Sequence, residues 1–323
     1  MTHAIRIHAT GGPEVLQWEQ VPTPEPGPGQ VLIEQAAIGL NFIDVYFRSG
    51  LYKTPLPMTP GMEAAGTVLK LGPGVMDLAE GDRVAYASMP LGAYAERRIM
   101  PADRLVRLPA AISLQTAAGM MMSGLTAQFL LHRTYAVKPG DKILLYAAAG
   151  GVGLVMCQWA KRLGAIVIGV VSSESKAALA ASHGADHVLL ESEDIPARVR
   201  DITQGAMVPV VYDSIGAATF MSSLDSLAPL GTMVSFGNAS GPVPPVDLGL
   251  LAAKGSLFIT RPSLVTYTAK RSALLSAAAD LFSVVEEGVV RIEVGQTFPL
   301  REAAEAHRAL EARRTMGSTV LLP

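Results

Sequence analysis

The glycine-rich segment at residues 147–153, AAAGGVG, follows an apolar run, KILLY, and precedes a helical pattern. Between a strand and a helix, glycines let the backbone turn sharply and approach a phosphate group closely. The amides and the dipole of the helix then stabilise negative charge. A plain tight turn would also accept these glycines. We expect Gly150, Gly151 and Val152 to contact a bound dinucleotide.

The residues after the next strand-like run indicate which dinucleotide this loop would bind. NAD-preferring sites usually place Asp or Glu there, whereas this chain has VVSSESK. The hydroxyls of Ser172 and Ser173 and the ammonium of Lys176 suit a 2′-phosphate. The alternative is that Ser173 only caps a helix and Lys176 is solvated, and Glu174 could oppose a phosphate. The pattern favours NADP over NAD.

A β-sheet is needed to bring these groups together, and the chain from about residue 141 has the alternating strand and helix pattern that predicts one. Strand-like runs alternate with helical patterns. The runs are KILLY, AIVIGVV, HVLL, PVVYDS, GTMVSFG and SLFIT, and the helical patterns are GVGLVMCQWAKRLG, ESKAALAASHG, DIPARVRDITQ and ATFMSSLDSLAP. Six strands with five crossovers predict a doubly wound parallel sheet of the α/β class. Because AAAGGVG lies at its first strand–helix junction, dinucleotide binding is favoured over a plain turn.

The first part of the chain has a different rhythm. Short β-type runs such as VLIEQAAIG, GMEAAGTVLKLG and GDRVAYAS are separated by glycine and proline, which predicts a mostly antiparallel β domain. After the alternating region, a long helix near 268–287, the helical pattern LREAAEAHRALEAR and a final strand STVLLP are expected to complete that domain. We predict a β-rich catalytic domain at 1–125, completed by 262–323, and a dinucleotide-binding domain at 126–261.

Composition excludes several classes of protein. The 26 basic and 28 acidic side chains give a net charge of −2 without a basic block, so neither a dedicated nucleic-acid partner nor an anionic membrane surface is expected. We expect no membrane span and no secretory signal. Cys157 is the only cysteine, which excludes an intramolecular disulfide and suits a reducing compartment. A cytoplasmic location is expected.

With these residues in place, the chain resembles the medium-chain dehydrogenase/reductase superfamily. Within it, the chain is most similar to the zinc-free NADPH:quinone oxidoreductases that include zeta-crystallin. The resemblance covers essentially the whole chain and rests on an ordered set of motifs: GLNFIDVYFRSGLY, GMEAAGTV, GDRVAYA, YAAAGGVG, VVYDSIG, MVSFGNASG and FITRPSL. It implies a GroES-like catalytic domain, a Rossmann-type domain, NADPH bound in the cleft between them, and a homodimer.

The resemblance also bears on metal chemistry. The superfamily's zinc alcohol dehydrogenases have a cysteine near the start of NFIDVY and a histidine before the glutamate of GMEAAG, where this chain has Asn41 and Met62. No metal site is therefore expected. Without a Lewis acid an alcohol is hard to convert into an alkoxide, whereas a quinone is already electrophilic and hydrogen bonds to its oxygens suffice. Glu63 is expected to be a structural carboxylate rather than a proton donor.

Further site residues are implied by the resemblance. Asn41 would bond the substrate oxygen or the cofactor, with a turn or helix-cap role as the alternative. Tyr46 and Tyr52 would line the substrate cleft, with packing as the alternative. The remaining expected cofactor contacts, mostly near strand ends, are Thr126, Ser214, Phe236, Gly237, Asn238, Phe258, Thr260 and Arg261. Glu191 stands near a tyrosine that contacts the adenosine phosphate in some relatives, so NADP affinity is expected to be lower here.

The expected activity is NADPH-dependent reduction of quinones, by hydride or electron transfer, through positioning and electrostatic support of the developing oxyanion. Reduction of the double bond in an α,β-unsaturated ketone or aldehyde is the alternative within the enzymes. A non-enzymatic NADPH- or RNA-binding protein is the alternative outside them, and the near-neutral charge argues against dedicated RNA binding.

Overall fold

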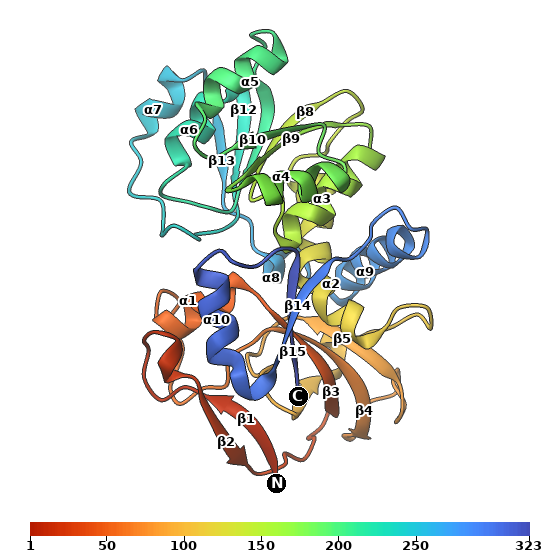
Figure 1. Ribbon diagram of the computed structural model, residues 1–323. Helices are drawn as coiled ribbons and strands as arrows, with labels where there is room; N and C mark the ends of the chain where they lie inside the picture. Colours follow the sequence, from red (N-terminus) through yellow and green to blue (C-terminus); the bar gives the residue numbers. More distant parts are fainter. The chain divides into compact units, whose positions relative to one another are not determined.

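The computed structural model describes residues 1–323 and divides into two compact units (Figure 1). The first, here called the β unit, contains Met1–Leu125, Thr268–Glu286 and Ile292–Pro323. The second, here called the αβ unit, contains Thr126–Tyr267 and Glu287–Arg291. No helix in the structure is both long enough and apolar enough to span a membrane.

The β unit is built on a seven-stranded sheet with the order β14-β15-β3-β4-β5-β7, in which β6 also pairs with β3. All of its pairs are antiparallel except β14 with β15. Its strands are β3 (Gln30–Leu40), β4 (Glu63–Leu71), β5 (Arg83–Ala87), β6 (Arg97–Pro101), β7 (Val106–Arg107), β14 (Val294–Pro299) and β15 (Ser318–Leu322). A separate antiparallel pair joins β1 (Thr2–Arg6) to β2 (Gln17–Val21).

Helices complete the β unit. The short helix α1 (Phe42–Ser49) starts directly after β3 and ends at Gly50, whose φ of +84° suits glycine. The others are α9 (Arg271–Glu286) and α10 (Ala303–Glu311), and α2 (Leu114–Phe129) begins in this unit. The apolar core includes Ile5, Ile38, Tyr94 and Leu321, so residues near both ends of the chain share one core.

The αβ unit contains a six-stranded, wholly parallel sheet with the order β10-β9-β8-β11-β12-β13. Its strands are β8 (Lys142–Tyr146), β9 (Ile166–Val171), β10 (His187–Leu190), β11 (Val208–Asp213), β12 (Leu227–Ser235) and β13 (Phe258–Thr260). The order reverses between β8 and β11, and ligands of open α/β sheets bind at such a reversal. The predicted fold class, a mostly antiparallel β domain with a parallel Rossmann-type sheet, is confirmed.

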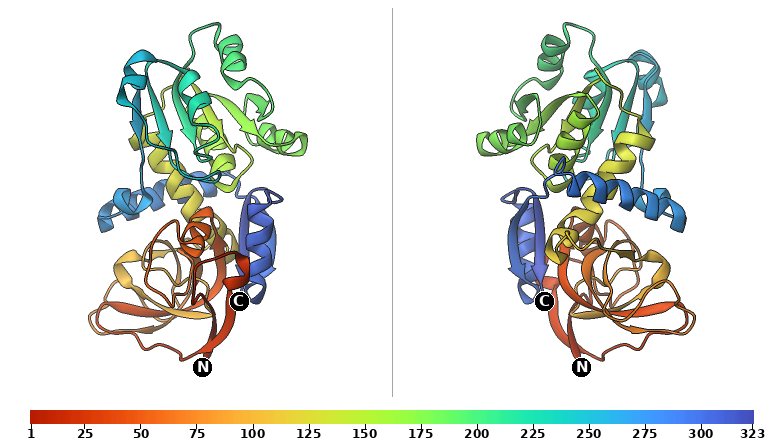
Figure 2. Two further views of the ribbon diagram at one scale, coloured as in Figure 1. Left: turned by 90° about the vertical axis from the view of Figure 1, so that its left-hand side faces the viewer. Right: turned by 90° about the vertical axis from the view of Figure 1, so that its right-hand side faces the viewer.

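The crossover helices pack on this sheet (Figure 2): α3 and α4 contact β9, and α6 contacts β11 and β12. The helices of the unit are α3 (Gly151–Arg162), α4 (Glu174–Ser182), α5 (Ile195–Thr203), α6 (Phe220–Asp225), α7 (Leu248–Ala253) and α8 (Leu264–Tyr267). One prediction was wrong in extent, because the helical pattern ATFMSSLDSLAP was expected to continue to Pro229. The helix α6 ends at Asp225 and β12 starts at Leu227. Because proline disfavours helical geometry in the residue before it, Ala228 and Pro229 are unsuited to continuing the helix.

Candidate active site

The glycine loop leads from β8 into α3. Gly150 is the N-cap of α3, in an extended conformation with φ −81° and ψ 172°, and no side chain caps the helix there. The first amides of a helix have no partner within the helix. A Cβ on Gly153 would lie 2.3 Å from the carbonyl oxygen of Ala147, so only glycine fits that position. The loop therefore presents uncapped amides at a helix N-terminus, which fits a pyrophosphate.

The predicted 2′-phosphate residues lie together after β9. Lys176 Nζ donates to Ser172 Oγ at 3.3 Å, and Ser173 Oγ accepts from the Lys176 backbone N–H at 3.4 Å as the N-cap of α4. The Ala148 N–H donates to Val170 O at 3.1 Å, so the glycine loop runs beside the end of β9. Ser173 is therefore a helix cap that also lies beside the glycine loop, so its position is compatible both with a capping role and with a contact to a 2′-phosphate.

Two carboxylates lie at the same edge of the sheet. Glu191 follows β10, and its N–H donates to Val171 O at 2.9 Å, which places it beside the residue that precedes Ser172. Glu174 is the first residue of α4, and both glutamates are exposed. A phosphate bound by Lys176 would therefore have carboxylates near it, and these carboxylates oppose its negative charge.

The loops after β11 and β12 pack closely against each other. A Cβ on Gly237 would lie 2.3 Å from the carbonyl oxygen of Ser214, and Ala239 N–H donates to the same carbonyl at 3.2 Å. The guanidinium Nη1 of Arg261 donates to Ser235 O at 2.9 Å and to Gly237 O at 3.0 Å. These contacts bring Ser214, Gly237 and Arg261 together at the carboxyl ends of three neighbouring strands.

The other predicted residues of this unit lie as follows. With its amide oxygen toward Arg261, Asn238 accepts from Nη2 at 3.0 Å. Phe236 follows β12 and is half-buried, and Thr126 is buried in α2. Phe258 begins β13 in register with Thr232, away from the carboxyl end where Thr260 lies, and is 59% exposed. Phe258 is thus the one predicted contact on β13 that the strand register separates from this edge.

Asp213 is a buried residue of this edge that was not predicted from the sequence. It ends β11, is fully buried, and accepts hydrogen bonds from Ile215 N–H (2.7 Å) and Gly216 N–H (3.1 Å). It also accepts from Thr219 Oγ1 and Ser223 Oγ, each at 2.7 Å. Four donors fix this carboxylate, so it orders the loop that contains Ser214. An acidic residue at the end of an apolar strand, as in VVYDS, is the signal that could have identified it.

In the β unit, Asn41 is the N-cap residue of α1. Its backbone N–H donates to Asp44 Oδ2 at 2.9 Å, and its Nδ2 donates to Glu63 Oε2 at 2.7 Å. Further along α1, the ring of Tyr46 contacts that of Tyr52 edge-on, with centroids 5.3 Å apart. The structure therefore places Asn41 directly before one short helix, Tyr46 in it and Tyr52 shortly after it.

Two buried carboxyl groups flank Asn41. Glu63 is 2% exposed, and its Oε1 accepts from the Met122 N–H at 2.7 Å. Burial raises the pKa of Glu63 to about 8 and that of Asp44 to about 7. Asp44 was not selected from the sequence, although its spacing from Asn41 matches half of a capping box, in which the third helical residue bonds the N-cap N–H.

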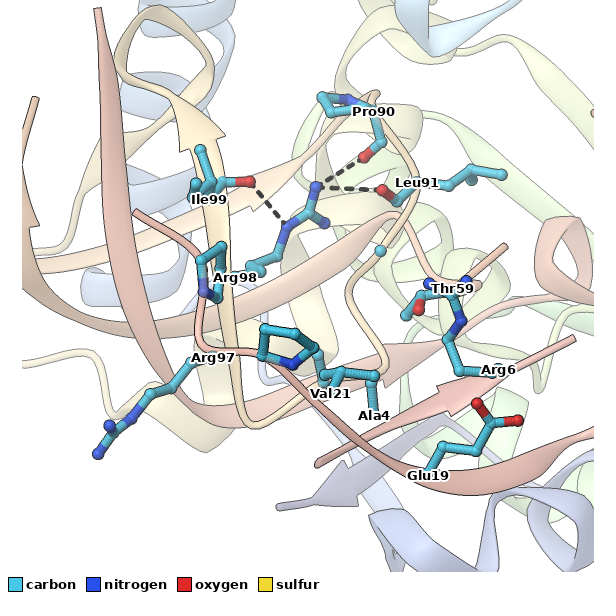
Figure 3. Close-up of a pocket in the computed structure, with 14 residues that line it drawn as sticks. Ala4, Arg6, Glu19, Val21, Thr59, Pro90, Leu91, Arg97, Arg98 and Ile99 are labelled. Carbon is cyan, nitrogen blue, oxygen red and sulfur yellow. Dashed lines mark hydrogen bonds between the residues drawn. The ribbon is translucent and has the colours of Figure 1, made fainter. Parts of the chain in front are cut away.

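A hollow of about 480 Å³ elsewhere in the β unit contains none of the predicted site residues. Strands β1, β2 and β6 and the segment around Pro90 line it (Figure 3). Arg98 Nη2 donates to Pro90 O (2.9 Å) and Leu91 O (3.3 Å), and its Nε donates to Ile99 O (3.3 Å). Because this guanidinium bonds the protein's own carbonyls, we do not place the site there.

Two protein-family models match the chain. The alcohol dehydrogenase GroES-like domain model matches residues 27–110, and the zinc-binding dehydrogenase model matches residues 151–278. The first match lies within the β unit, and most of the second lies within the αβ unit. No group of three or more His, Cys, Asp or Glu side chains in this structure is arranged to hold a metal ion.

The chain is also similar to characterised proteins over its full length. It is 52% identical to the quinone oxidoreductase of Pseudomonas aeruginosa, covering 100% of both chains. It is 47% identical to a 2-haloacrylate reductase of a Burkholderia species, covering 100% of this chain and 99% of that protein. The solved structure of Escherichia coli quinone oxidoreductase complexed with NADPH matches with a TM-score of 0.98 at 48% identity, covering 99% of this chain and 100% of that one.

Proposed function

The chain belongs to the quinone oxidoreductase family of the medium-chain dehydrogenase/reductase superfamily, and from this premise we propose that it catalyses the NADPH-dependent reduction of quinones. The observation that carries the proposal is the cluster at the carboxyl edge of the αβ unit's sheet. There the uncapped N-terminus of α3 lies beside the end of β9, after which Ser172 and Lys176 bond each other.

The αβ unit would hold NADPH through this cluster. The amides that start α3 would bind the pyrophosphate, and Ser172, Ser173 and Lys176 would bind the 2′-phosphate. The loops fixed by Asp213 and Arg261 would position the rest of the cofactor. When bound, NADPH supplies a hydride.

The β unit would hold the quinone near α1. Addition of a hydride to a quinone leaves negative charge on its oxygen, and one proton completes the hydroquinone. The carboxamide of Asn41 would hydrogen-bond that oxygen, because a donor already in position stabilises charge as it develops. Tyr46 and Tyr52 would present ring faces to the flat substrate, and water or a hydroxyl would supply the proton.

A second candidate activity is reduction of an activated carbon–carbon double bond. It is supported by the 47% identity to a protein named 2-haloacrylate reductase. Both reactions use the same hydride donor, and in both the developing negative charge is stabilised at an oxygen. Quinone reduction is favoured because a relative named quinone oxidoreductase is 52% identical to this chain, compared with 47% for the 2-haloacrylate reductase.

We further propose that the protein is a cytoplasmic homodimer. Strand β13 is at the edge of the αβ unit's sheet, and it exposes Phe258 and Ile259. An apolar edge strand with unpaired backbone groups is suited to pairing with a second copy of the chain. A reducing compartment suits the single cysteine, Cys157, which is buried and free.

The test is NADPH oxidation by the purified protein against matched panels of quinones, α,β-unsaturated carbonyl compounds and 2-haloacrylates. We expect quinones to give the highest kcat/KM. A higher kcat/KM for every compound with an activated double bond would replace the proposed reaction with the second candidate. Absence of NADPH oxidation with any acceptor would contradict both.

A further inference from the structure

Two carboxyl groups hold Asn41: Glu63 accepts from its side chain and Asp44 accepts from its backbone N–H. Asp44 has hydrogen-bond partners on only one of its two oxygens. Asp44 Oδ2 accepts from the Asn41 N–H at 2.9 Å and from the Tyr94 hydroxyl at 3.1 Å. Asp44 Oδ1 is buried and has no hydrogen-bond partner. The orientation of this fully buried side chain therefore depends on the two donors to Oδ2, of which only Tyr94 lies outside the first turn of α1.

A line of buried polar groups continues behind Tyr94. The Tyr94 hydroxyl lies 3.0 Å from Nε2 of His307 in α10, and Nδ1 of His307 lies 3.0 Å from Nη1 of Arg48. Arg48 also donates to both carboxylate oxygens of Glu311, each at 2.8 Å. Tyr94, His307 and Arg48 are at most 2% exposed. The line thus links α10 to the start of α1 through the core of the β unit.

The direction of every hydrogen bond in this line follows from Arg48. A guanidinium donates only, so Nδ1 of His307 must accept and Nε2 must carry the ring proton. Nε2 then donates to the Tyr94 oxygen, and the Tyr94 hydroxyl proton is directed to Asp44. Burial and the charge of Arg48 lower the pKa of His307 to about 3, which keeps the ring neutral in this tautomer. Every hydrogen bond of the line between Arg48 and Asp44 therefore donates in the same direction, towards Asp44, and Tyr94 is the last donor.

We propose that Tyr94 and His307 are positioning residues for the reductase reaction, which hold Asn41 in place through Asp44. This inference rests on the proposed function, in which Asn41 bonds the substrate oxygen. Removing the Tyr94 hydroxyl leaves Asp44 with the Asn41 N–H as its only donor. The first turn of α1 then loses its side-chain link to Tyr94, and the Asn41 carboxamide, which keeps only its bond to Glu63 Oε2 at 2.7 Å, is held less precisely. Misplacement of a donor lowers the rate because it no longer meets the developing charge.

The experiment is a double-mutant cycle on kcat for quinone reduction by the full-length protein, with Asn41→Ala, Tyr94→Phe and the double variant. We expect Asn41→Ala to lower kcat, and Tyr94→Phe to lower it about three- to tenfold, the effect of one hydrogen bond. In the Asn41→Ala background, Tyr94→Phe should change kcat by less than about twofold, because residues that act through one another are not additive.

Tyr86→Phe is the matched control. Tyr86 is also a fully buried tyrosine of the β unit, but its hydroxyl donates to Gln35 and accepts from Arg98 at 3.3 Å. It should lower the melting temperature about as much as Tyr94→Phe and leave kcat unchanged. If Tyr94→Phe does not fold, His307→Leu takes its place, because an apolar side chain can neither accept from Arg48 nor donate to Tyr94.

Equal losses of kcat from Tyr94→Phe in both backgrounds would overturn the inference, and so would an unchanged kcat in Tyr94→Phe. An unchanged kcat in Asn41→Ala would remove its basis. These results differ from failure of the proposed function, which is the absence of quinone reduction by the unaltered protein.

Discussion

At the level of single side chains, we propose that selection between the two nicotinamide dinucleotides depends on Lys176. Its Nζ bonds Ser172 at the edge of the sheet, where a 2′-phosphate would add a charge-assisted bond. We expect Lys176→Ala to raise KM for NADPH about tenfold, equivalent to roughly 1.4 kcal/mol, and to leave KM for NADH within about twofold. Initial rates with each dinucleotide provide the measurement.

Lys161→Ala is a suitable control for this variant. Lys161 is on α3 and pairs with Asp186 at 3.3 Å, with 58% of its side chain exposed. Its removal changes the net charge by the same amount without touching the serine cluster. An equal rise in KM for both dinucleotides in Lys176→Ala would show that Lys176 does not distinguish them.

The buried carboxyl group of Glu63 gives a second prediction at this scale. Burial raises its pKa from 4.5 to about 8, so between these values the folded protein keeps a proton that the unfolded chain has released. Stability therefore falls as pH rises through this interval, by about 1.4 kcal/mol per pH unit for the group. We expect Glu63→Gln to reduce the fall in melting temperature between pH 6 and pH 8.

The exposed residue Glu25, with 73% of its side chain accessible, provides the control. Glu25→Gln should retain the pH dependence of the unaltered protein. If Glu63→Gln has the same fall in melting temperature as Glu25→Gln, Glu63 is ionised throughout this range in the folded state.

At the level of elements, the junction between β8 and α3 contains two glycines that we expect to have different roles. Gly153 is required by close packing, whereas Gly150 is expected to allow close approach of the ligand. A Cβ on Gly153 would lie 2.3 Å from Ala147 O, whereas the nearest atom to a Cβ on Gly150 is the same oxygen at 3.2 Å. Gly153→Ala should therefore lower the melting temperature by about 5 °C, as overpacking costs about 1–3 kcal/mol. Gly150→Ala should fold with a smaller loss and bind NADPH more weakly, which fluorescence titration and thermal melting together would measure. Equal melting temperatures for the two variants would contradict this assignment.

Local patterns predicted most of the elements. All six strands of the parallel sheet occur where the apolar runs place them, and the family resemblance read from the motifs is confirmed. Strand β14 (Val294–Pro299) was not predicted, because its alternating half-buried and exposed residues form no apolar run. The six-residue helix α7 was also missed, since it is too short to show a helical period.

In the candidate site too, features with a local sequence pattern could be predicted, and features without one could not. The glycine loop and the Ser172–Lys176 cluster could be selected because each is a short segment whose chemistry is local. Tyr94 and His307 are 213 positions apart, and Tyr94 and Asp44 are 50 apart. No spacing rule connects such residues, so only the fold could bring them together.

At the level of the whole molecule, the exposed edge strand β13 predicts how two copies would associate. Ile259 is 37% exposed in this strand. A lysine there would place a charge in the interface between the paired strands. Natural edge strands use lysine in this way to avoid association. We expect Ile259→Lys to convert the dimer to a monomer, measured by light scattering against the 33.9 kDa mass of one chain.

Met76→Lys is the control for this variant, because Met76 is 94% exposed and lies in the β unit. It should remain dimeric. A monomeric unaltered protein, or a dimeric Ile259→Lys variant, would exclude β13 as the interface.

The position of β15 (Ser318–Leu322) has a consequence for the order in which the molecule is assembled during translation. This strand lies inside the sheet of the β unit, between β14 and β3 (Figure 1). A ribosome makes β3 early, and β6 pairs with its first half, but β15, the partner of Ile38–Leu40 on the same side, emerges only after the whole αβ unit has been synthesised. The Ile38–Leu40 end of β3 therefore has an unpaired edge while the αβ unit can already fold, and such an edge is exposed to wrong pairing. The helix α1 follows β3 directly, and its Arg48 gains the contacts with His307 and Glu311 of α10 only near the end of synthesis.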